Sequence, residues 1–152
     1  MVSRFEQFAF VISGIYRCIQ KIEKDEMIKQ GYRGAFAQYL AALNRFEEGL
    51  TSAQLCEICD KDKAAVSRIV SEMEEKGLAK RSNPSKYRAK IILTEKGKET
   101  AEFVAERARI AVTAVSGDFM TKEQRENFYY TLDTISKNLQ KISEEGVPQN
   151  EG

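Results

Sequence analysis

Apolar residues recur along much of the chain at intervals of three and four, which is the period of an amphipathic helix. The pattern predicts a first helix to about residue 30, before a break bracketed by Gly31 and Gly34, and a second helix that Gly49 ends. The apolar positions of these two helices are Phe5, Phe8, Ile12, Ile15, Tyr16, Ile19 and Ile22, then Phe36, Tyr39, Leu40, Leu43 and Phe46. Each predicted helix therefore carries one apolar stripe.

Two further helices begin at polar residues that favour helix N-termini. Thr51, followed three positions later by Gln54, forms a capping-box pattern that opens a short helix. Asp62 is a suitable N-cap for a longer helix over residues 63–76, and Gly77 predicts a Schellman-type end. The apolar positions of the longer helix are Val66, Ile69, Val70 and Met73.

The pattern then changes to two short strands and two long helices. Residues 78–82 and 89–94 are typical of strands, and the Asn-Pro-Ser-Lys run between them is typical of a turn. One helix follows from Thr94, and a second capping box at Thr121 opens another. The apolar positions of that last helix step by four and three, as in a coiled-coil seam, at Phe128, Leu132, Ile135, Leu139 and Ile142. The order predicts a mainly α fold with one small β-hairpin.

Residues 51–76 have the pattern of a helix-turn-helix, in which two helices cross closely and certain positions must be small or apolar. Leu55 and Cys59 are expected to face the core from the first helix, and Cys56 takes the position where only a small side chain fits. The turn carries Asp60-Lys61 in place of a glycine and an apolar residue, which requires an aspartate at positive φ.

Charge is unevenly distributed along the 152 residues. The net charge is +1, but residues 76–98 hold eight basic residues and one acid, so this stretch carries +7 and the remainder −6. Such a patch suits contact with a polyanion, although a lysine-rich solvated hairpin has the same composition. Histidine, GxxxxGK[ST] and GxGxxG are absent, which disfavours an enzyme, and no cofactor or metal is expected.

The longer helix of the helix-turn-helix has two unlike halves. Its first two turns carry basic and small polar residues, and its C-terminal half carries Glu72, Glu74 and Glu75. Because phosphate repels carboxylates, only the first two turns can enter a major groove, where Arg68 is placed to pair bidentately with guanine. In an amphipathic helix whose charges only balance the helix dipole, the acids would lie at the N-terminal end, whereas here they lie at the C-terminal end.

These runs resemble the MarR family of winged-helix transcription regulators. The similarity is carried by Leu50-Thr51-Ser52-Ala53-Gln54-Leu55, Asp62-Lys63-Ala64-Ala65-Val66-Ser67-Arg68, Lys76-Gly77-Leu78 and Ile92-Leu93-Thr94-Glu95-Lys96-Gly97. The resemblance implies a homodimer that binds double-stranded DNA at a pseudo-palindromic operator as a ligand-responsive repressor. It also implies four regions: a dimerisation helix (1–34), a winged helix-turn-helix lobe (35–98), dimerisation helices (99–145) and a disordered tail (146–152).

The DNA contacts implied by the resemblance lie on the longer helix and on the hairpin, the wing, which would reach the minor groove. They are Ser52, Lys63, Ala64, Ala65, Ser67, Arg68, Arg81, Lys86, Tyr87 and Arg88. The wing departs from the family, which carries an acid and an arginine two residues later. Here Ser85, Lys86 and Tyr87 occupy that region and Arg88 follows one place later.

The resemblance also implies an effector pocket between the dimerisation helices and the DNA-binding lobe. Aromatic side chains and one cation are expected to line it for a small aromatic acid, whose carboxylate the arginine would meet. These residues are Tyr16, Tyr32, Arg33, Phe36 and Tyr39. The alternative is that the aromatic residues are core.

Three further expectations concern the cysteines, the compartment and the function class. Cys56 and Cys59 form a CxxC and Cys18 stands alone, so a thiol redox sensor is one hypothesis and small core residues are the other. The N-terminal sequence has no signal-peptide pattern and no apolar stretch long enough for a membrane span, so a cytoplasmic protein is expected. The alternative function is a winged-helix module whose basic hairpin binds an acidic protein.

Overall fold

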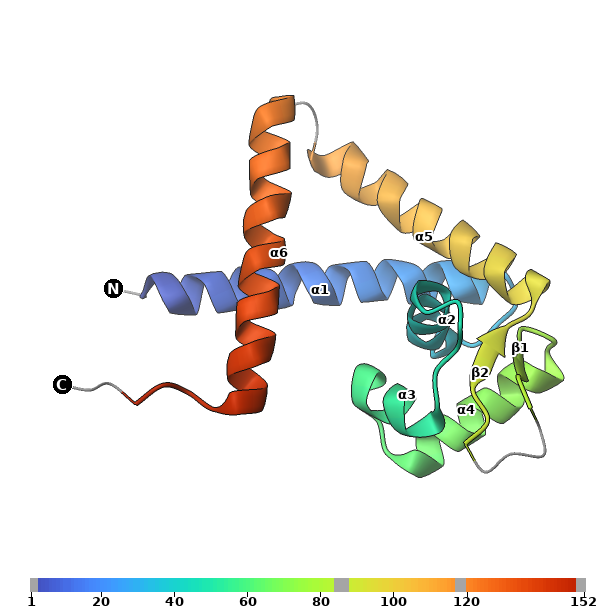
Figure 1. Cartoon of the computed structure of the whole chain (residues 1–152). Coiled ribbons are helices and arrows are strands. Elements are labelled where there is room, and N and C mark those ends of the chain that lie inside the picture. The colour runs from blue at the N-terminus through green and yellow to red at the C-terminus, as the bar shows by residue number, and fades with distance from the viewer. Residues whose placement is uncertain (1–2, 84–87, 117–119, 150–152) are drawn as a thin grey trace. The chain divides into compact units, whose positions relative to one another are not determined.

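The computed structural model of the chain describes residues 3–83, 88–116 and 120–149. Six helices and two strands follow one another in these residues (Figure 1). They are α1 (Arg4–Lys29), α2 (Phe36–Arg45), α3 (Ser52–Cys59), α4 (Lys63–Glu75), β1 (Ala79–Arg81), β2 (Ile91–Leu93), α5 (Glu95–Ser116) and α6 (Lys122–Glu145). The predicted mainly α class with one β-hairpin is confirmed.

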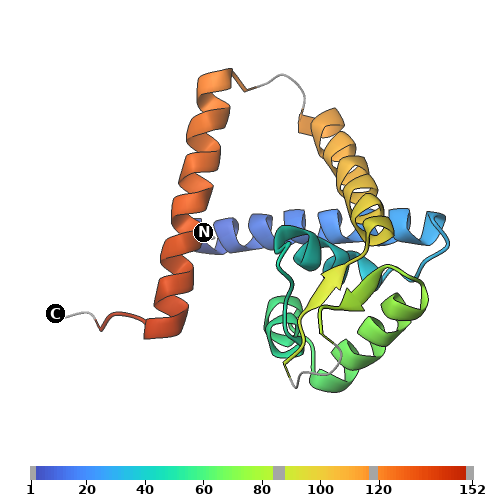
Figure 2. The same ribbon diagram turned by 45° about the vertical axis from the view of Figure 1, so that its right-hand side comes forward.

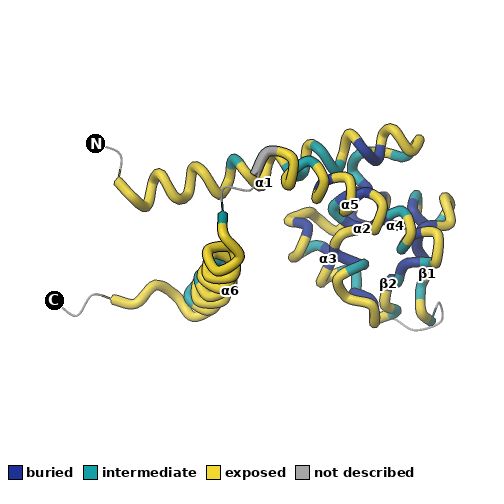
Figure 3. Tube along the Cα trace, turned by 90° about the horizontal axis from the view of Figure 1, so that it is seen from above, coloured by how far each residue is buried: buried dark blue, intermediate teal, exposed yellow. Residues whose placement is uncertain are grey.

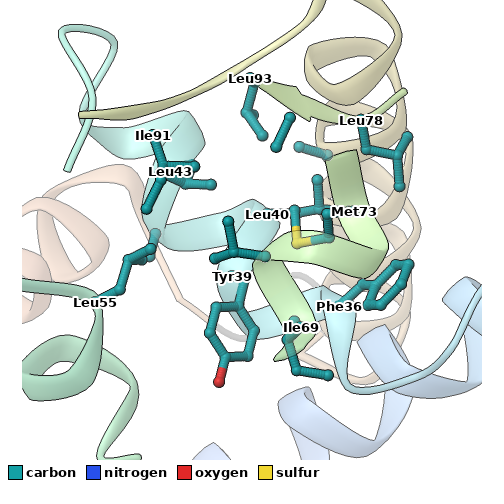
Figure 4. Close-up of a cluster of buried hydrophobic side chains, with 14 of the residues drawn as sticks. Phe36, Tyr39, Leu40, Leu43, Leu55, Ile69, Met73, Leu78, Ile91 and Leu93 are labelled. Carbon is teal, nitrogen blue, oxygen red and sulfur yellow. The ribbon is translucent and has the colours of Figure 1, made fainter. Parts of the chain in front are cut away.

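The hydrophobic core is built around α2, which packs against α1, α3 and β2. Phe36, Tyr39 and Leu40 of this helix are almost fully buried (Figure 4). The other elements contribute Met27, Leu55, Val66, Met73, Leu78, Ile91 and Val104, among others. Because α2 presents its apolar face to several elements at once, the helix-turn-helix and the hairpin are fixed against one core.

The helix-turn-helix forms as its sequence predicts. The side chain of Thr51 accepts a hydrogen bond from the backbone of Gln54 and completes a capping box at α3, while Asp62 Oδ1 accepts one from Ala65 N at 2.8 Å. Asp60 ends α3 in the left-handed region, at φ 50°, which confirms the aspartate at positive φ. The predicted core positions of α4 are all buried.

The end of α2 differs from the prediction. The helix stops at Arg45, four residues before Gly49, because the chain must turn towards β2. Leu50 exchanges backbone hydrogen bonds with Ile91 at 3.0 and 2.8 Å. Gly49 has φ +88°, and a Cβ there would lie 2.7 Å from the Ile91 carbonyl oxygen. Gly49 therefore permits the close approach of two backbones and does not act as the cap of α2.

The predicted hairpin is present, with shorter strands than expected. β1 pairs antiparallel with β2, in the register Ala79 to Leu93, and Ser82 N adds a hydrogen bond to Lys90 O. The hairpin lies beside α4 in two views (Figure 2). α4 ends in the predicted Schellman motif, since Leu78 N donates to Met73 O and Gly77 N to Glu74 O. The loop at 84–87 lies outside the described residues.

Two helical regions leave their apolar residues exposed (Figure 3). One is the N-terminal part of α1, where Phe5 is 74% and Ile15 51% exposed. The other is α6, which has no buried residue, and in which Leu139 is 53% exposed. By compactness the chain divides between residues 112 and 113. The end of α1 and the start of α5 contribute Met27, Ala101 and Val104 to the same core as the helix-turn-helix.

Candidate nucleic-acid interface

The first two turns of α4 present a polar face opposite the core. Lys63, Ala64, Ser67 and Arg68 are exposed, and Ala65 is half-buried. Val66, Ile69 and Val70 are buried on the other side of the same turns, which fixes the rotation of the helix. The structure therefore brings together the five predicted contacts of α4 on one accessible surface.

The cations on this surface are unpaired, whereas the acids further along α4 are paired. Within residues 3–83, 88–116 and 120–149, neither Lys63 nor Arg68 has an ion-pair partner. Glu72 meets the guanidinium of Arg33, and Glu74 Oε1 lies 3.2 Å from Arg81 Nε. The N-terminal end of α4 thus keeps free positive charge, while much of the negative charge at its C-terminal half is neutralised inside the fold.

The predicted DNA contacts outside α4 differ from one another in exposure. Arg88 is exposed, whereas Arg81 is half-buried and engaged by Glu74. Lys86 and Tyr87 lie outside the described residues. Ser52 is half-buried in the first turn of α3. The sequence missed that Arg81 and Arg33 pair with α4, because each pair joins two different parts of the fold and leaves no signal in helical spacing.

Part of the basic stretch at 76–98 lies away from the start of α4. Lys96 Nζ donates to the carbonyl oxygen of Lys76, at the C-terminal end of α4, at 3.1 Å and lies 5.8 Å from the ring centroid of Tyr32. A helix of 13 residues is about 20 Å long, so these two lysines are remote from Lys63. Lys80 and Lys90 remain exposed on the hairpin.

The five residues of the predicted effector pocket lie in different surroundings. Phe36 and Tyr39 are core residues, and Arg33 pairs with Glu72. Tyr32 packs on the core with its ring 6.3 Å from that of Phe36. Tyr16 is 61% exposed, in the N-terminal part of α1. The positions of Tyr32, Phe36 and Tyr39 support the core interpretation for these three residues, whereas Tyr16 is not a core residue. A cavity among the described residues has other walls.

The cysteines are free thiols. Cys59 is buried, and burial, followed by the charge of Cys56, raises the pKa of its thiol to about 11. A thiol with so high a pKa is a poor nucleophile, which supports a packing role for Cys59. Cys56 packs against the core and Cys18 is exposed. Among the described residues, no cluster of His, Cys, Asp or Glu suits a metal ion.

Comparison with known proteins gives the same class as the fold. A family model described as the MarR family matches residues 34–89, which run from α2 to β1 and end before β2. A MarR-family regulator from Silicibacter pomeroyi has a TM-score of 0.72 at 20% identity, covering 88% of this chain and 90% of its own. A MarR regulator from Methanosarcina mazei Go1 has a TM-score of 0.75 at 22% identity, covering 93% and 94%.

A third similar structure is a putative MarR-family regulator from Listeria monocytogenes in complex with a 26mer DNA, with a TM-score of 0.71 at 18% identity and 99% coverage of both chains. No curated protein matches the chain. The fold and the family model define a winged-helix protein that is similar to MarR-family transcription regulators. The match to the family model lies in the winged helix-turn-helix region of this chain. None of the described helices has the length and apolar character to cross a membrane.

Proposed function

We propose that this protein is a sequence-specific DNA-binding regulator that inserts the first two turns of α4 into the major groove. The observation that carries the proposal is the exposed Arg68, which has no ion-pair partner among the described residues and lies beside Lys63 and Ser67. The acid at this end of α4 is Asp62, whose carboxylate is engaged in capping the helix. An arginine there can donate two hydrogen bonds to a guanine edge, and a lysine can neutralise phosphate. The DNA complex of the Listeria monocytogenes relative supports this assignment for the fold.

The test is DNA selection from a random duplex pool with the purified protein, followed by affinity measurements on the selected site. Arg68→Ala should weaken specific binding by about 1–3 kcal/mol. Arg45→Ala, which removes an exposed arginine at the end of α2, is the matched control and should bind as wild type. Equal affinity of Arg68→Ala and wild type would remove α4 from the interface.

Lys86 of the wing stays a proposed minor-groove contact, and Arg88 is its exposed neighbour. Lys86→Ala should weaken binding to all sequences and reduce the slope of log affinity against log salt by about one. The absence of salt-dependent DNA binding would instead favour an acidic protein partner as the target of the basic hairpin.

We further propose a homodimer that uses the exposed apolar faces of α1 and α6. Monomeric proteins rarely leave such faces uncovered, and a two-fold axis would bury each face against its copy. Ile15→Glu on α1 should shift the protein towards monomer in sedimentation experiments at micromolar concentration. Ile58→Glu on α3 is the control, because Ile58 is 48% exposed and Ile15 51%, but it lies outside both faces. A monomeric wild type would exclude this assembly.

The finer regulatory role is a ligand-responsive repressor at a pseudo-palindromic operator, in which a ligand changes operator affinity by its differential binding to two conformations. A dimer with two recognition helices would read half-sites roughly one helical turn apart. A reporter gene behind the selected site should be repressed when the wild-type protein is present. Arg68→Ala should repress it less strongly. Activation of the reporter would reverse the proposed sign.

A further inference from the structure

The C-terminal end of α4 is held through its backbone by the residues that open α5. Three consecutive carbonyl oxygens, those of Lys76, Gly77 and Leu78, accept hydrogen bonds there. Their donors are, in the same order, Lys96 Nζ at 3.1 Å, Thr94 Oγ1 at 2.5 Å and Thr94 N at 3.0 Å. Because carbonyl oxygens at a helix end lack partners within the helix, these bonds both satisfy them and join α4 to α5.

The loop between α1 and α2 meets the same end of α4 with its side chains. Arg33 Nη1 donates to Glu72 Oε1 at 2.6 Å and also contacts the second carboxylate oxygen. The ring centroid of the neighbouring Tyr32 lies 5.8 Å from Lys96 Nζ, the nitrogen that donates to the end of α4. Lys96 therefore lies between the loop and the helix end, where a cation interacts favourably with both the aromatic ring and the helix dipole.

The loop is itself held at both of its ends. Tyr32 N donates to Met27 O at 3.1 Å, at the end of α1, and Phe36 N donates to Arg33 O at 3.0 Å, at the start of α2. Tyr32 also packs against the core. Because backbone hydrogen bonds and core packing fix this loop, its side chains can hold a second element in place.

These contacts add to what the core already fixes. Val66 and Met73 are buried, which sets the rotation of α4 about its own axis. The side chains of Arg33 and Glu72 are 52% and 29% exposed, so their ion pair contributes little to the free energy of unfolding. Its contribution is geometric, because α4 is about 20 Å long and a tilt of about 5° at one end displaces the other end by about 2 Å. Hydrogen bonds to base edges do not tolerate such a displacement.

We propose that Arg33 and Lys96 are positioning residues for DNA recognition, which hold the C-terminal end of α4 so that Arg68 meets base edges in the correct geometry. Both cations are engaged at the end of α4 that lies opposite Lys63, so neither is assigned a contact with DNA. The inference rests on the proposed function, because α4 must be the helix that reads DNA. It gives Lys96 a different role from the phosphate contact that a basic stretch suggests.

Glu72, the partner of Arg33, gives the sharpest test, because two interpretations predict opposite signs. Removing an acid from a DNA-binding helix strengthens binding when the acid only repels phosphate. If Glu72 holds α4 in place, Glu72→Ala should instead weaken binding to the selected site about three- to tenfold. Glu75→Ala is the matched control, since Glu75 is an exposed acid of the same helix with no ion pair among the described residues. It should bind as tightly as wild type or more tightly.

The salt dependence of binding separates positioning from phosphate contact. Arg33→Ala and Lys96→Met should weaken specific binding by a similar factor and leave the slope of log affinity against log salt unchanged, because no phosphate contact is lost. A direct phosphate contact would instead reduce the slope by about one and weaken binding to random duplex equally. The double variant Arg33→Ala with Glu72→Ala should bind no more weakly than either single variant, because both remove the same contact.

All variants are compared with wild type on the selected site, after circular dichroism has shown the helical content of wild type. Glu72→Ala that binds like Glu75→Ala, unchanged binding by Arg33→Ala or Lys96→Met, or a reduced salt slope in either, would overturn the inference and leave the DNA-binding proposal intact. A wild type that selects no site from the random pool would overturn both.

Discussion

The winged-helix core and the outer helices are both rich in large apolar residues, but only the core buries them within the chain. Phe36 of α2 is 1% exposed, whereas Phe5 of α1 is 74% exposed. Each lies at a position that an amphipathic period predicts. The difference is that α2 is covered by α1, α3 and β2, whereas the N-terminal part of α1 has no comparable cover within its compact unit.

The comparison shows that an apolar period specifies a face and does not specify what covers it. In the core, the covering elements belong to the same chain and are held by caps, turns and a hairpin. The faces of α1 and α6 would be covered by a second copy of the chain in the proposed homodimer. The two regions should therefore respond differently to the same kind of substitution.

Phenylalanine truncation should give the largest contrast. Phe36→Ala should destabilise the fold by about 3–5 kcal/mol, through lost burial and a residual cavity. Phe5→Ala should cost less than about 1 kcal/mol in dilute solution, where the side chain is already exposed. Urea unfolding at several protein concentrations checks both, and the proposed dimer requires that Phe5→Ala reduce the concentration dependence of the midpoint. A large loss in Phe5→Ala independent of concentration would show that α1 is covered within one chain.

Adding a methyl group to a glycine should give the next contrast. A Cβ at Gly97 would lie 1.9 Å from the Leu78 carbonyl oxygen, so Gly97→Ala would push the backbones of α5 and Leu78 apart in the core. This substitution should lower the free energy of unfolding by about 3 kcal/mol. Gly14 lies within α1, and the nearest atom to its Cβ would be an Arg17 side-chain nitrogen at 3.9 Å. Gly14→Ala should therefore stabilise α1 by up to about 1 kcal/mol through helix propensity. Thermal unfolding of both variants measures the sign of each change in stability. A destabilising Gly14→Ala would indicate a contact of α1 that the structure does not show.

The cysteines of the core and of α1 should differ in chemical reactivity for the same reason. The pKa of Cys59 is about 11, so at pH 8 only about a thousandth of this thiol is ionised, whereas Cys18 is exposed. Iodoacetamide at pH 8 should modify Cys18 first, as peptide mass spectrometry would show. Because the folded-state pKa of Cys59 is raised above the ordinary value of 9.0, its contribution to stability is intact below pH 9 and is lost as the pH rises from 9 to 11. Cys59→Ala should lose that alkaline dependence, and rapid modification of Cys59 in the folded protein would contradict its burial.

The smallest expected effect is the dependence of stability on acid pH that Glu26 causes. Lys29 and Arg107 hold the pKa of Glu26 below its ordinary value, so its contribution is present above about pH 4.5 and is lost as the pH falls through the lowered pKa. Glu26→Gln should flatten stability against pH on the acid side, as measured by urea unfolding at a series of pH values. Glu102→Gln, an exposed acid of α5, should leave the curve unchanged. An unchanged curve in Glu26→Gln would mean that the ion pairs do not persist in solution.

The sequence alone determined the local elements of the DNA-binding lobe. Thr51 with Gln54 and Asp62 mark helix starts because their side chains accept backbone N–H groups a few residues away. Gly77 marks a helix end for a similarly local reason. The polar face of α4 was also predictable, since its rotation follows from the period of the buried residues Val66, Ile69, Val70 and Met73.

Only the tertiary structure decided which charges are available and where space remains. Arg33 and Arg81 are cations in the sequence, but their pairing with Glu72 and Glu74 depends on how the α1–α2 loop and β1 pass α4. The end of α2 was likewise set by the approach of Leu50 to β2, and not by Gly49 as a cap. The cavity that Glu23 lines likewise has walls that come from three helices. Such pairings and cavities arise between residues distant along the chain, and local periodicity carries no record of them.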